Sequence, residues 1–323
     1  MVSYIIRRLL VMIPMIIILS IMLFMIVELP PGDYVTINQN QGKMMTAKEI
    51  ENLEVRYGLD KPVYQRYLIW AGNILKGDLG YSQYYMRPVT EMIGARITLT
   101  IVISFSALIF SWIIAFPIGI YSAIRQYSFG DYFWTFIAFL GLSIPSFILA
   151  LVMMYYSAKY VGADIGGLFS PEFINASWSV AKFMDFLKHL WIPMVIIGVG
   201  GSASLIRILR ANLLDEIRKP YVDLARARGL KEINLILKYP LKIAINPFIS
   251  SLTWLLPSLI SGSIIVEIVL NLPTMGPIFL KAIKMQDTAM AGSFLIILGI
   301  LTILSSLISD ILLAWFDPRI KYS

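Results

Sequence analysis

The sequence contains no cysteine, and His189 is the one histidine among its 323 residues. The absence of thiols excludes disulfides, thiolate metal sites and cysteine nucleophiles, and one imidazole cannot supply the paired histidines of a zinc enzyme. The apolar segments also contain no convincing Ser/Lys or Asp/Asp dyad. We therefore expect no catalytic, metal-binding or cofactor-binding residue on this chain.

The sequence also lacks a nucleotide-binding loop. The phosphate-binding pattern Gly-x-x-x-x-Gly-Lys-[Ser/Thr] requires a Gly-Lys pair followed by a hydroxyl side chain. The one Gly-Lys pair, Gly42-Lys43, is followed by Met44. The energy for any active process must therefore come from another chain or from an ion gradient.

Charged residues are scarce, at 15% of the chain against about a quarter in soluble domains, while 58% of the residues are apolar. The mean hydropathy is +0.75. A helix of roughly 20 mostly apolar residues is long enough to cross the hydrocarbon core of a bilayer. We predict an all-α integral membrane protein with six transmembrane helices, at residues 9–29, 97–121, 133–158, 190–209, 244–270 and 290–315.

The formal net charge of +7 comes from Lys and Arg in loops between apolar runs, and no basic domain is present that would bind nucleic acid. Positive residues in short loops mark the cytoplasmic side of a membrane protein. The largest cluster lies between Arg207 and Lys242. We predict a single membrane domain, 1–323, embedded in lipid, with both termini inside, a cytoplasmic loop at 210–243 and an extracytoplasmic segment at 30–96.

The 30–96 segment carries helix signals of its own. Thr-Ala-Lys-Glu at 46–49 has the form of a capping sequence, and residues 64–75 place apolar side chains at helical spacing. Lys-Gly-Asp-Leu-Gly at 76–80 then ends the pattern. We predict a small folded cap on the outer face, suited to meeting a partner or guiding a solute.

Five residues in the apolar segments are candidates for gating or for lining a pore. Ser143, Pro145 and Ser146 predict a break in the third segment, because proline frees a backbone carbonyl and serine hydroxyls can satisfy freed groups. A kink that serves packing alone is an equal alternative. Glu267 and Asp310 are carboxylates in the fifth and sixth segments, where charged groups usually face protein or water. A pore-lining or proton-relay group is the functional interpretation of both, and a buried residue bonded to a neighbouring helix or lying near the interface is the alternative.

The most informative polar interruption lies at 220–229, between the fourth and fifth apolar segments. Proline suits the first turn of a helix, Asp223 complements the positive end of the helix dipole, and Gly229 is a typical helix stop. Ala225 and Ala227 would present a small surface that permits close approach by another protein. The pattern predicts a short docking helix, and an amphipathic helix lying on lipid headgroups is the alternative.

Residues 221–230 resemble the cytoplasmic EAA loop of binding-protein-dependent ABC importer permeases, in the form of the oligopeptide/dipeptide branch, Tyr-x-x-x-Ala-Arg-Ala-Lys-Gly-Leu. The matching positions are Tyr221, Ala225, Arg226, Ala227, Arg228, Gly229 and Leu230. Asp223 stands at the Glu position of the general motif. Leu224 replaces its first Ala, and Lys242 falls where its Pro would be.

Further motifs extend the resemblance along the whole chain in the order of the family. They lie at 4–10, 31–33, 57–62, 77–82, 143–147, 266–269, 272–276 and 317–320. Thr274 stands where the family usually has Gly. The chain is similar to the first, B-type permease subunit of such importers.

The resemblance implies a type I importer permease fold with a cytoplasmic coupling helix at 220–229. It implies a heterodimer with a second, similar permease, one or two cytoplasmic ATPase subunits that bind ATP and Mg²⁺, and an extracytoplasmic solute-binding protein. This chain would then be a transport subunit without a cofactor, and not an enzyme. The implied ATPase-coupling residues are Tyr221, Asp223, Ala225, Arg226, Ala227 and Gly229.

Rigid attachment of the coupling helix to the preceding span would be needed for this mechanism. Asp215 and Glu216 lie near Arg210, Arg218 and Lys219 and are expected to provide it. Exposed ion pairs usually contribute under about 1 kcal/mol each.

The resemblance favours dipeptides and oligopeptides as solutes, taken up across a prokaryotic cytoplasmic (inner) membrane. Oligosaccharides are the alternative, and nickel is less favoured because the apolar segments contain no histidine or cysteine. The rival from another class is a self-contained proton-coupled carrier that uses Glu267 or Asp310. That rival predicts uptake by this chain alone.

Overall fold

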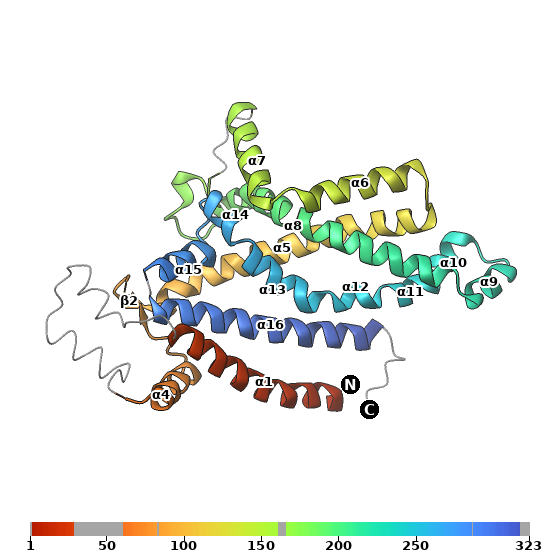
Figure 1. Cartoon of the computed structure of the whole chain (residues 1–323). Helices are drawn as coiled ribbons and strands as arrows, with labels where there is room; N and C mark the ends of the chain where they lie inside the picture. Colours follow the sequence, from red (N-terminus) through yellow and green to blue (C-terminus); the bar gives the residue numbers. More distant parts are fainter. Residues whose placement is uncertain (1, 29–60, 83, 161–165, 286, 317–323) are drawn as a thin grey trace. The chain divides into compact units, whose positions relative to one another are not determined.

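The computed structural model describes residues 2–28, 61–82, 84–160, 166–285 and 287–316. The chain divides into two compact units. One comprises residues 1–6, 99–273 and 302–323, and the other comprises residues 7–98 and 274–301. Helices make up most of the described part of the chain (Figure 1), so the predicted all-α class is confirmed.

Within the second unit, α1 (Val2–Glu28) and α4 (Val63–Leu75) meet through aromatic side chains. The centroid of the Phe24 ring lies 5.6 Å from that of Tyr67 and 5.4 Å from that of Trp70. The hydroxyls of Ser20 and Tyr67 share a hydrogen bond of 2.9 Å. These contacts bury part of α1 that would otherwise expose apolar side chains.

Helix α4 confirms the helix predicted at 64–75, and the chain leaves it where the sequence predicts. Gly77 and Gly80 have φ angles of 81° and 87°, in the left-handed region that glycine adopts without strain. The capping sequence at 46–49, the motifs at 31–33 and 317–320, and most of 57–62 lie outside the described residues.

A buried carboxylate ties the segment after α4 to the start of the last helix. The elements are antiparallel strands β1 (Tyr81–Ser82) and β2 (Arg87–Pro88), paired Tyr81 to Pro88 and Ser82 to Arg87, with α15 (Met275–Lys284) and α16 (Thr288–Phe316). The carboxylate of Asp287 accepts hydrogen bonds from the Ser82 hydroxyl at 2.5 Å and from the amides of Tyr84 and Met290 at 3.2 and 3.1 Å. Asp287 thus caps α16 and fixes the 77–82 motif to it.

The first unit is built around the long helix α8. Its elements are α5 (Val89–Ile124) from residue 99 onward, α6 (Phe129–Ser143), α7 (Ser146–Tyr160), η1 (Pro171–Phe173), α8 (Val180–Ile217), α9 (Pro220–Ala227), α10 (Glu232–Lys238), α11 (Pro240–Ala244), α12 (Asn246–Ser250), α13 (Leu252–Gly262), α14 (Ile264–Val269) and the end of α16. Leu205, Leu209 and Leu213 on α8 are fully buried at a spacing of one helical turn. Phe248, also fully buried, packs against Trp112 of α5, with the ring centroids 5.3 Å apart and the rings tilted by 53°. The apolar stripe of α8 therefore forms the core of this unit.

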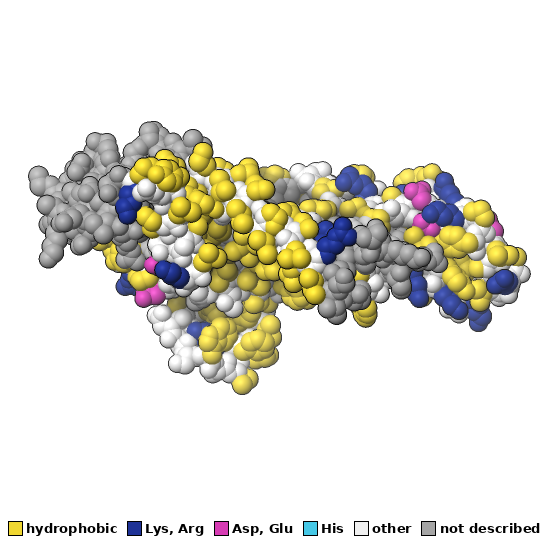
Figure 2. All heavy atoms as spheres, turned by 90° about the horizontal axis from the view of Figure 1, so that it is seen from below, with side chains coloured by type: hydrophobic (Ala, Val, Ile, Leu, Met, Phe, Trp, Pro, Cys, Tyr) yellow, Lys and Arg dark blue, Asp and Glu magenta, His cyan; other side chains and the backbone are white. Residues whose placement is uncertain are grey.

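Five helical stretches are long and apolar enough to cross a bilayer: Ile6–Ile26, Val89–Ile124, Val180–Ile217, Asn246–Val269 and Thr288–Phe316. Helices α6 and α7 meet the same criterion only as a pair, and they bend by 98° at the break between them. The described residues thus contain five candidate spans, or six if the bent pair counts as one. Figure 2 shows that hydrophobic side chains cover much of one face of the protein.

The helix boundaries differ from the predicted segments: α5 begins at Val89 and not at residue 97, and α8 begins at Val180 and not at residue 190. Helix α8 continues to Ile217, so the loop predicted at 210–243 begins as helix. The segment predicted as one helix at 244–270 consists of α12, α13 and α14, with turns at Ser251 and Ser263. The hydroxyls of these serines bond the carbonyls of residues 248 and 260, and such local hydrogen bonds compete with the helical ladder.

Candidate functional site

Helix α9 begins and ends where the sequence predicts. Pro220 is its first residue, Asp223 lies in its first turn and Arg226 lies in its last. Gly229 follows with a φ of 79°, and its amide donates to the Arg226 carbonyl at 3.0 Å. This left-handed residue turns the chain toward α10, so that α9 and α10 form a helical hairpin at the end of α8 (Figure 1).

Helix α9 has one buried and one exposed face. Val222 is fully buried and Ala225 is 8% exposed, whereas Leu224 is 58% exposed and Asp223 and Ala227 are also exposed. The structure thus corrects the expectation for the two alanines: Ala227 faces outward, but Ala225 packs inside the chain. The reason is the helical period, which places residues three apart on the same side.

The buried side chain of Glu216, in the last turn of α8, holds the start of α9. Its carboxylate pairs with the Lys219 ammonium and accepts a hydrogen bond of 2.7 Å from the Tyr221 hydroxyl. The predicted attachment through Glu216 and Lys219 is therefore confirmed. Tyr221, expected to couple to a partner, also anchors α9 within this chain.

Arg226 joins α9 to α10. Its guanidinium donates to both oxygens of the Glu232 carboxylate, at 3.1 and 2.8 Å, and to Asp223 at 2.8 Å. The hydrogen bond from Arg226 lowers the pKa of Glu232, and the same bond raises the pKa of Arg226. Lys, Arg, Asp and Glu side chains gather at the right of Figure 2, on the side where Figure 1 places α9 and α10.

We expect the hairpin of α9 and α10 to loosen in acid. The pKa of Glu232 in the folded protein is lower than its ordinary value of 4.5, so its contribution is complete above 4.5 and is lost as pH falls through the lowered value. Amide hydrogen-exchange protection over residues 221–238 would be compared between roughly pH 6 and pH 3. The Glu232→Gln variant is the control and should lose less protection in acid. Equal losses in both proteins would contradict the prediction.

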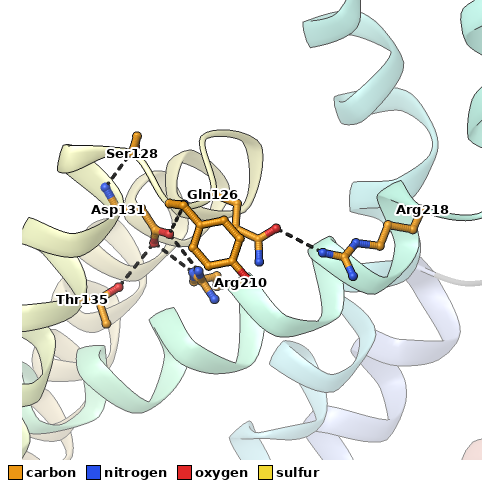
Figure 3. A network of polar contacts seen from close by, with 7 residues as sticks. Gln126, Ser128, Asp131, Thr135, Arg210 and Arg218 are labelled. Atoms are coloured by element: carbon orange, nitrogen blue, oxygen red, sulfur yellow. Dashed lines mark hydrogen bonds and ion pairs between the residues drawn. The ribbon is translucent and has the colours of Figure 1, made fainter.

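The sequence led us to expect that Arg210 would pair with the acidic residues near the end of α8, but its partner is Asp131. Its Nε and Nη2 donate to Oδ1 and Oδ2 of Asp131 at 2.9 and 2.8 Å, a bidentate pair across 79 residues of sequence (Figure 3). The physical reason is that Glu216 is already engaged by Lys219 and Tyr221, while Arg210 lies where α8 packs against α6.

Asp131, the partner of Arg210, was not among the residues that the sequence analysis selected. It is 2% exposed, lies in the first turn of α6, and accepts a hydrogen bond from the Tyr127 amide at 3.0 Å. Its own amide donates to the Ser128 hydroxyl at 3.2 Å. The pattern Ser-x-x-Asp at 128–131 is a capping signal that could have marked it, but that pattern indicates a helix start and not an arginine partner.

The break predicted at Ser143, Pro145 and Ser146 is confirmed. Helix α6 ends at Ser143, α7 begins at Ser146, and the chain bends by 98° between them. The Ser143 hydroxyl donates to the Phe139 carbonyl at 2.8 Å, within the last turn of α6.

The two intramembrane carboxylates lie on different helices. Glu267 of α14 is 1% exposed, and the Ser263 hydroxyl donates to its carboxylate at 2.6 Å. Asp310 is half-buried on α16. Among the residues that the structure describes, no group of three His, Cys, Asp or Glu side chains could hold a metal ion. The contact at Glu267 lies within one helical turn and is consistent with a structural role.

The fold is that of a type I ABC importer permease. A chain of the MetNI methionine ABC transporter, solved in inward-facing conformations, superposes with a TM-score of 0.52, at 18% identity over 71% of this chain and 97% of that chain. At this level of identity the likeness shows the fold alone.

Sequence comparison then gives the family. The model of the binding-protein-dependent transport system inner membrane component matches residues 115–322, and the model of its N-terminal region matches residues 1–104. The chain is 35% identical to the oligopeptide transport system permease protein AppB of Bacillus subtilis and 31% identical to the dipeptide transport system permease protein DppB of Alkalihalophilus pseudofirmus, over 100% of each chain. The chain belongs to the binding-protein-dependent transport system inner membrane component family.

Family membership confirms the class predicted from the sequence. The protein is a permease subunit of a bacterial ABC importer, located in the inner membrane, and it is a transport component and not an enzyme. An importer of this kind works with an ATPase and a solute-binding protein. The rival class, a self-contained proton-coupled carrier, is not favoured.

Proposed function

We propose that this chain is the first, B-type permease of an importer that takes up dipeptides or oligopeptides delivered by an extracytoplasmic binding protein. The names of AppB and DppB support this solute class, because both relatives match over the full length of the chain. The pore would form between this chain and a second, similar permease. This chain would contribute six spans, with both termini inside and an extracytoplasmic cap at 30–96.

Helix α9 is the coupling helix of this proposal, and its geometry carries the argument. A partner that binds α9 would meet Leu224, Asp223 and Ala227, because these side chains are exposed. Ala225 and Tyr221 would act from inside by fixing the position of α9. One or two ATPase subunits would bind this face and would hold the ATP and Mg²⁺, so this chain would bind no cofactor.

The remaining coupling residues shape the hairpin. Arg226 holds α10 against α9, and Gly229 provides the turn between the two helices. When the ATPases close on ATP, the coupling helices of the two permeases would approach each other. The attached spans would then rock and switch the pore between inward-open and outward-open states.

The gate of this proposal lies at the α6–α7 break. Ser143, Pro145 and Ser146 would let the two helices change their angle, because the helical ladder is already interrupted there. Glu267 and Asp310 would stabilise packing near the pore and would not carry protons.

The first test is purification of the tagged chain from its native membrane, followed by reconstitution into vesicles. We expect a second permease and one or two phosphate-loop ATPases to copurify, and peptide uptake to require ATP and the binding protein. Recovery of the chain alone, with proton-driven uptake that Glu267→Gln abolishes, would establish the carrier instead.

Charge reversal on the exposed face of α9 gives a sharper result. Asp223→Lys should weaken ATPase association by about tenfold, since both the helix-dipole complement and the partner contact change sign. Glu172→Lys, an exposed reversal on η1, is the matched control and should leave association unchanged. Equal ATPase recovery with both variants would show that α9 is not part of the ATPase-binding surface.

A further inference from the structure

The turn between α5 and α6 is held to α8 at two points. Arg210 donates to both carboxylate oxygens of Asp131, and Arg218, just after α8, donates to the side-chain carbonyl of Gln126 at 3.1 Å. Figure 3 shows both arginines reaching toward the same turn. The last two turns of α8 are thus attached to the start of α6.

The contact at Asp131 is the more specific of the two. The side chain of Asp131 is 3% exposed and that of Arg210 is 27% exposed, so the pair is largely shielded from water. A shielded bidentate pair fixes the relative orientation of two helices more strictly than an exposed pair. Thr135 also donates to the Asp131 carboxylate, at 3.4 Å.

The Asp131 carboxylate also stabilises an unusual backbone. Tyr127 has a φ of 63°, in the left-handed region that residues other than glycine rarely adopt, and its amide donates to Asp131. Ser128 caps the same helix start. The Asp131 carboxylate therefore joins the turn before α6 to the contact with α8.

These contacts form a continuous path from α9 to the α6–α7 break. Tyr221 and Lys219 attach the start of α9 to Glu216, and α8 is an uninterrupted helix of 38 residues that carries both Glu216 and Arg210. The bond between Arg210 and Asp131 then connects α8 to α6, and α6 ends at the break beside Pro145. Displacement of α9 would therefore displace α6 as well, provided that the pair stays intact.

We propose that Asp131 and Arg210 are positioning residues that transmit the movement of the coupling helix α9 to the α6–α7 break. The inference rests on the proposed function of α9. The pair acts by orienting α6 and contacts neither solute nor ATP. Its loss uncouples hydrolysis from transport without removing the ATPase-binding face.

The test uses the complete importer, with both permeases, the ATPases and the binding protein, reconstituted in vesicles. The measured quantity is peptide taken up per ATP hydrolysed, together with hydrolysis in the absence of the binding protein. The variants are Asp131→Asn, Arg210→Gln and the double variant. Asparagine keeps an oxygen for the Tyr127 amide, so the start of α6 is preserved while the charge pair is lost.

We expect each single variant to lower uptake per ATP by about fivefold, and the double variant to be no worse than the more affected single variant. Hydrolysis without the binding protein should stay within about twofold of the unsubstituted importer. Arg207→Gln, an exposed arginine one turn earlier on α8, is the control and should change neither quantity. Unchanged uptake per ATP in Asp131→Asn and Arg210→Gln would overturn the proposal, and so would additive effects in the double variant.

A distance measurement on the otherwise unsubstituted chain decides the matter if the variants fail to assemble. The protein contains no cysteine, so Phe129→Cys and Lys238→Cys give two unique spin-label sites at exposed positions on α6 and α10. The proposal expects the same distance without nucleotide and with ATP bound, because α6 and the α9–α10 hairpin move together. A distance that changes with ATP would overturn it.

The outcomes also separate this inference from the proposed function. An unsubstituted complex that binds no ATPase and hydrolyses no ATP would refute the importer itself. A complex that couples normally, and still does so in both single variants, would refute only the role of the pair.

Discussion

Replacing Gly229 with valine should reduce ATP-driven uptake by about tenfold or more, because a β-branched residue is strained at the left-handed backbone between α9 and α10. Gly229 has a φ of 79°, and a Cβ atom added there would meet no atom within 4 Å. The expected loss therefore comes from backbone conformation and not from a clash. The chain would leave α9 in another direction and displace the α10 side chains that hold it.

Asparagine at the same position separates this cause from others. Gly229→Asn should retain most of the uptake, because asparagine tolerates the left-handed region better than any β-branched residue. ATPase copurification and peptide uptake would be measured for both variants at equal amounts of permease in the membrane. If valine and asparagine gave the same activity, the turn at Gly229 would have no part in coupling.

Replacing Gly198 with valine should destabilise the first unit, lowering the apparent Tm of the purified permease by roughly 5 to 10 °C. A Cβ atom at Gly198 would lie 2.6 Å from the Phe110 ring and 2.9 Å from the Ala107 carbonyl oxygen. The ring can move, but the carbonyl belongs to helix α5 and cannot. In addition, the Ser111 hydroxyl donates to the Gly198 carbonyl at 2.7 Å, a contact that requires close approach of the two helices.

Gly200 provides a matched control on the same helix. It lies two residues further along α8, and a Cβ atom there would meet nothing within 4 Å. Gly200→Val changes helix propensity by the same amount and should leave the Tm nearly unchanged, as measured by thermal challenge followed by size-exclusion chromatography. A similar fall in both variants would show that propensity, and not the contact between α5 and α8, causes the effect of Gly198→Val.

Several features of the fold and of the site could be predicted because their signals are local. Long apolar runs predicted the helices, since a bilayer requires every backbone group to bond within its own segment. The proline, aspartate and glycine at 220, 223 and 229 predicted both ends of α9, because each residue type acts on the backbone next to it. The same reasoning located the break at Pro145.

Other features could not be predicted because they depend on which helix faces meet. Hydropathy gives the same value for Ala225 and Ala227, yet one packs inward and the other faces outward. Arg210 had nearby acidic residues in the sequence, but its partner is Asp131, 79 residues away. No local pattern encodes such a pairing, since it requires α6 and α8 to lie side by side.

Local signals in the amino-acid sequence were enough to predict the membrane class, the family and the positions of helix α9 and of the broken helix. Composition, periodicity and helix-end chemistry act within a few residues, and the family motifs are read directly from the chain. Three features depend on tertiary packing: the bend of 98°, the inward orientation of Ala225 and the attachment of α6 to α8 through Asp131 and Arg210. These follow from the packing of helices distant in sequence, where shape and burial select among several charge partners that the sequence leaves equally possible.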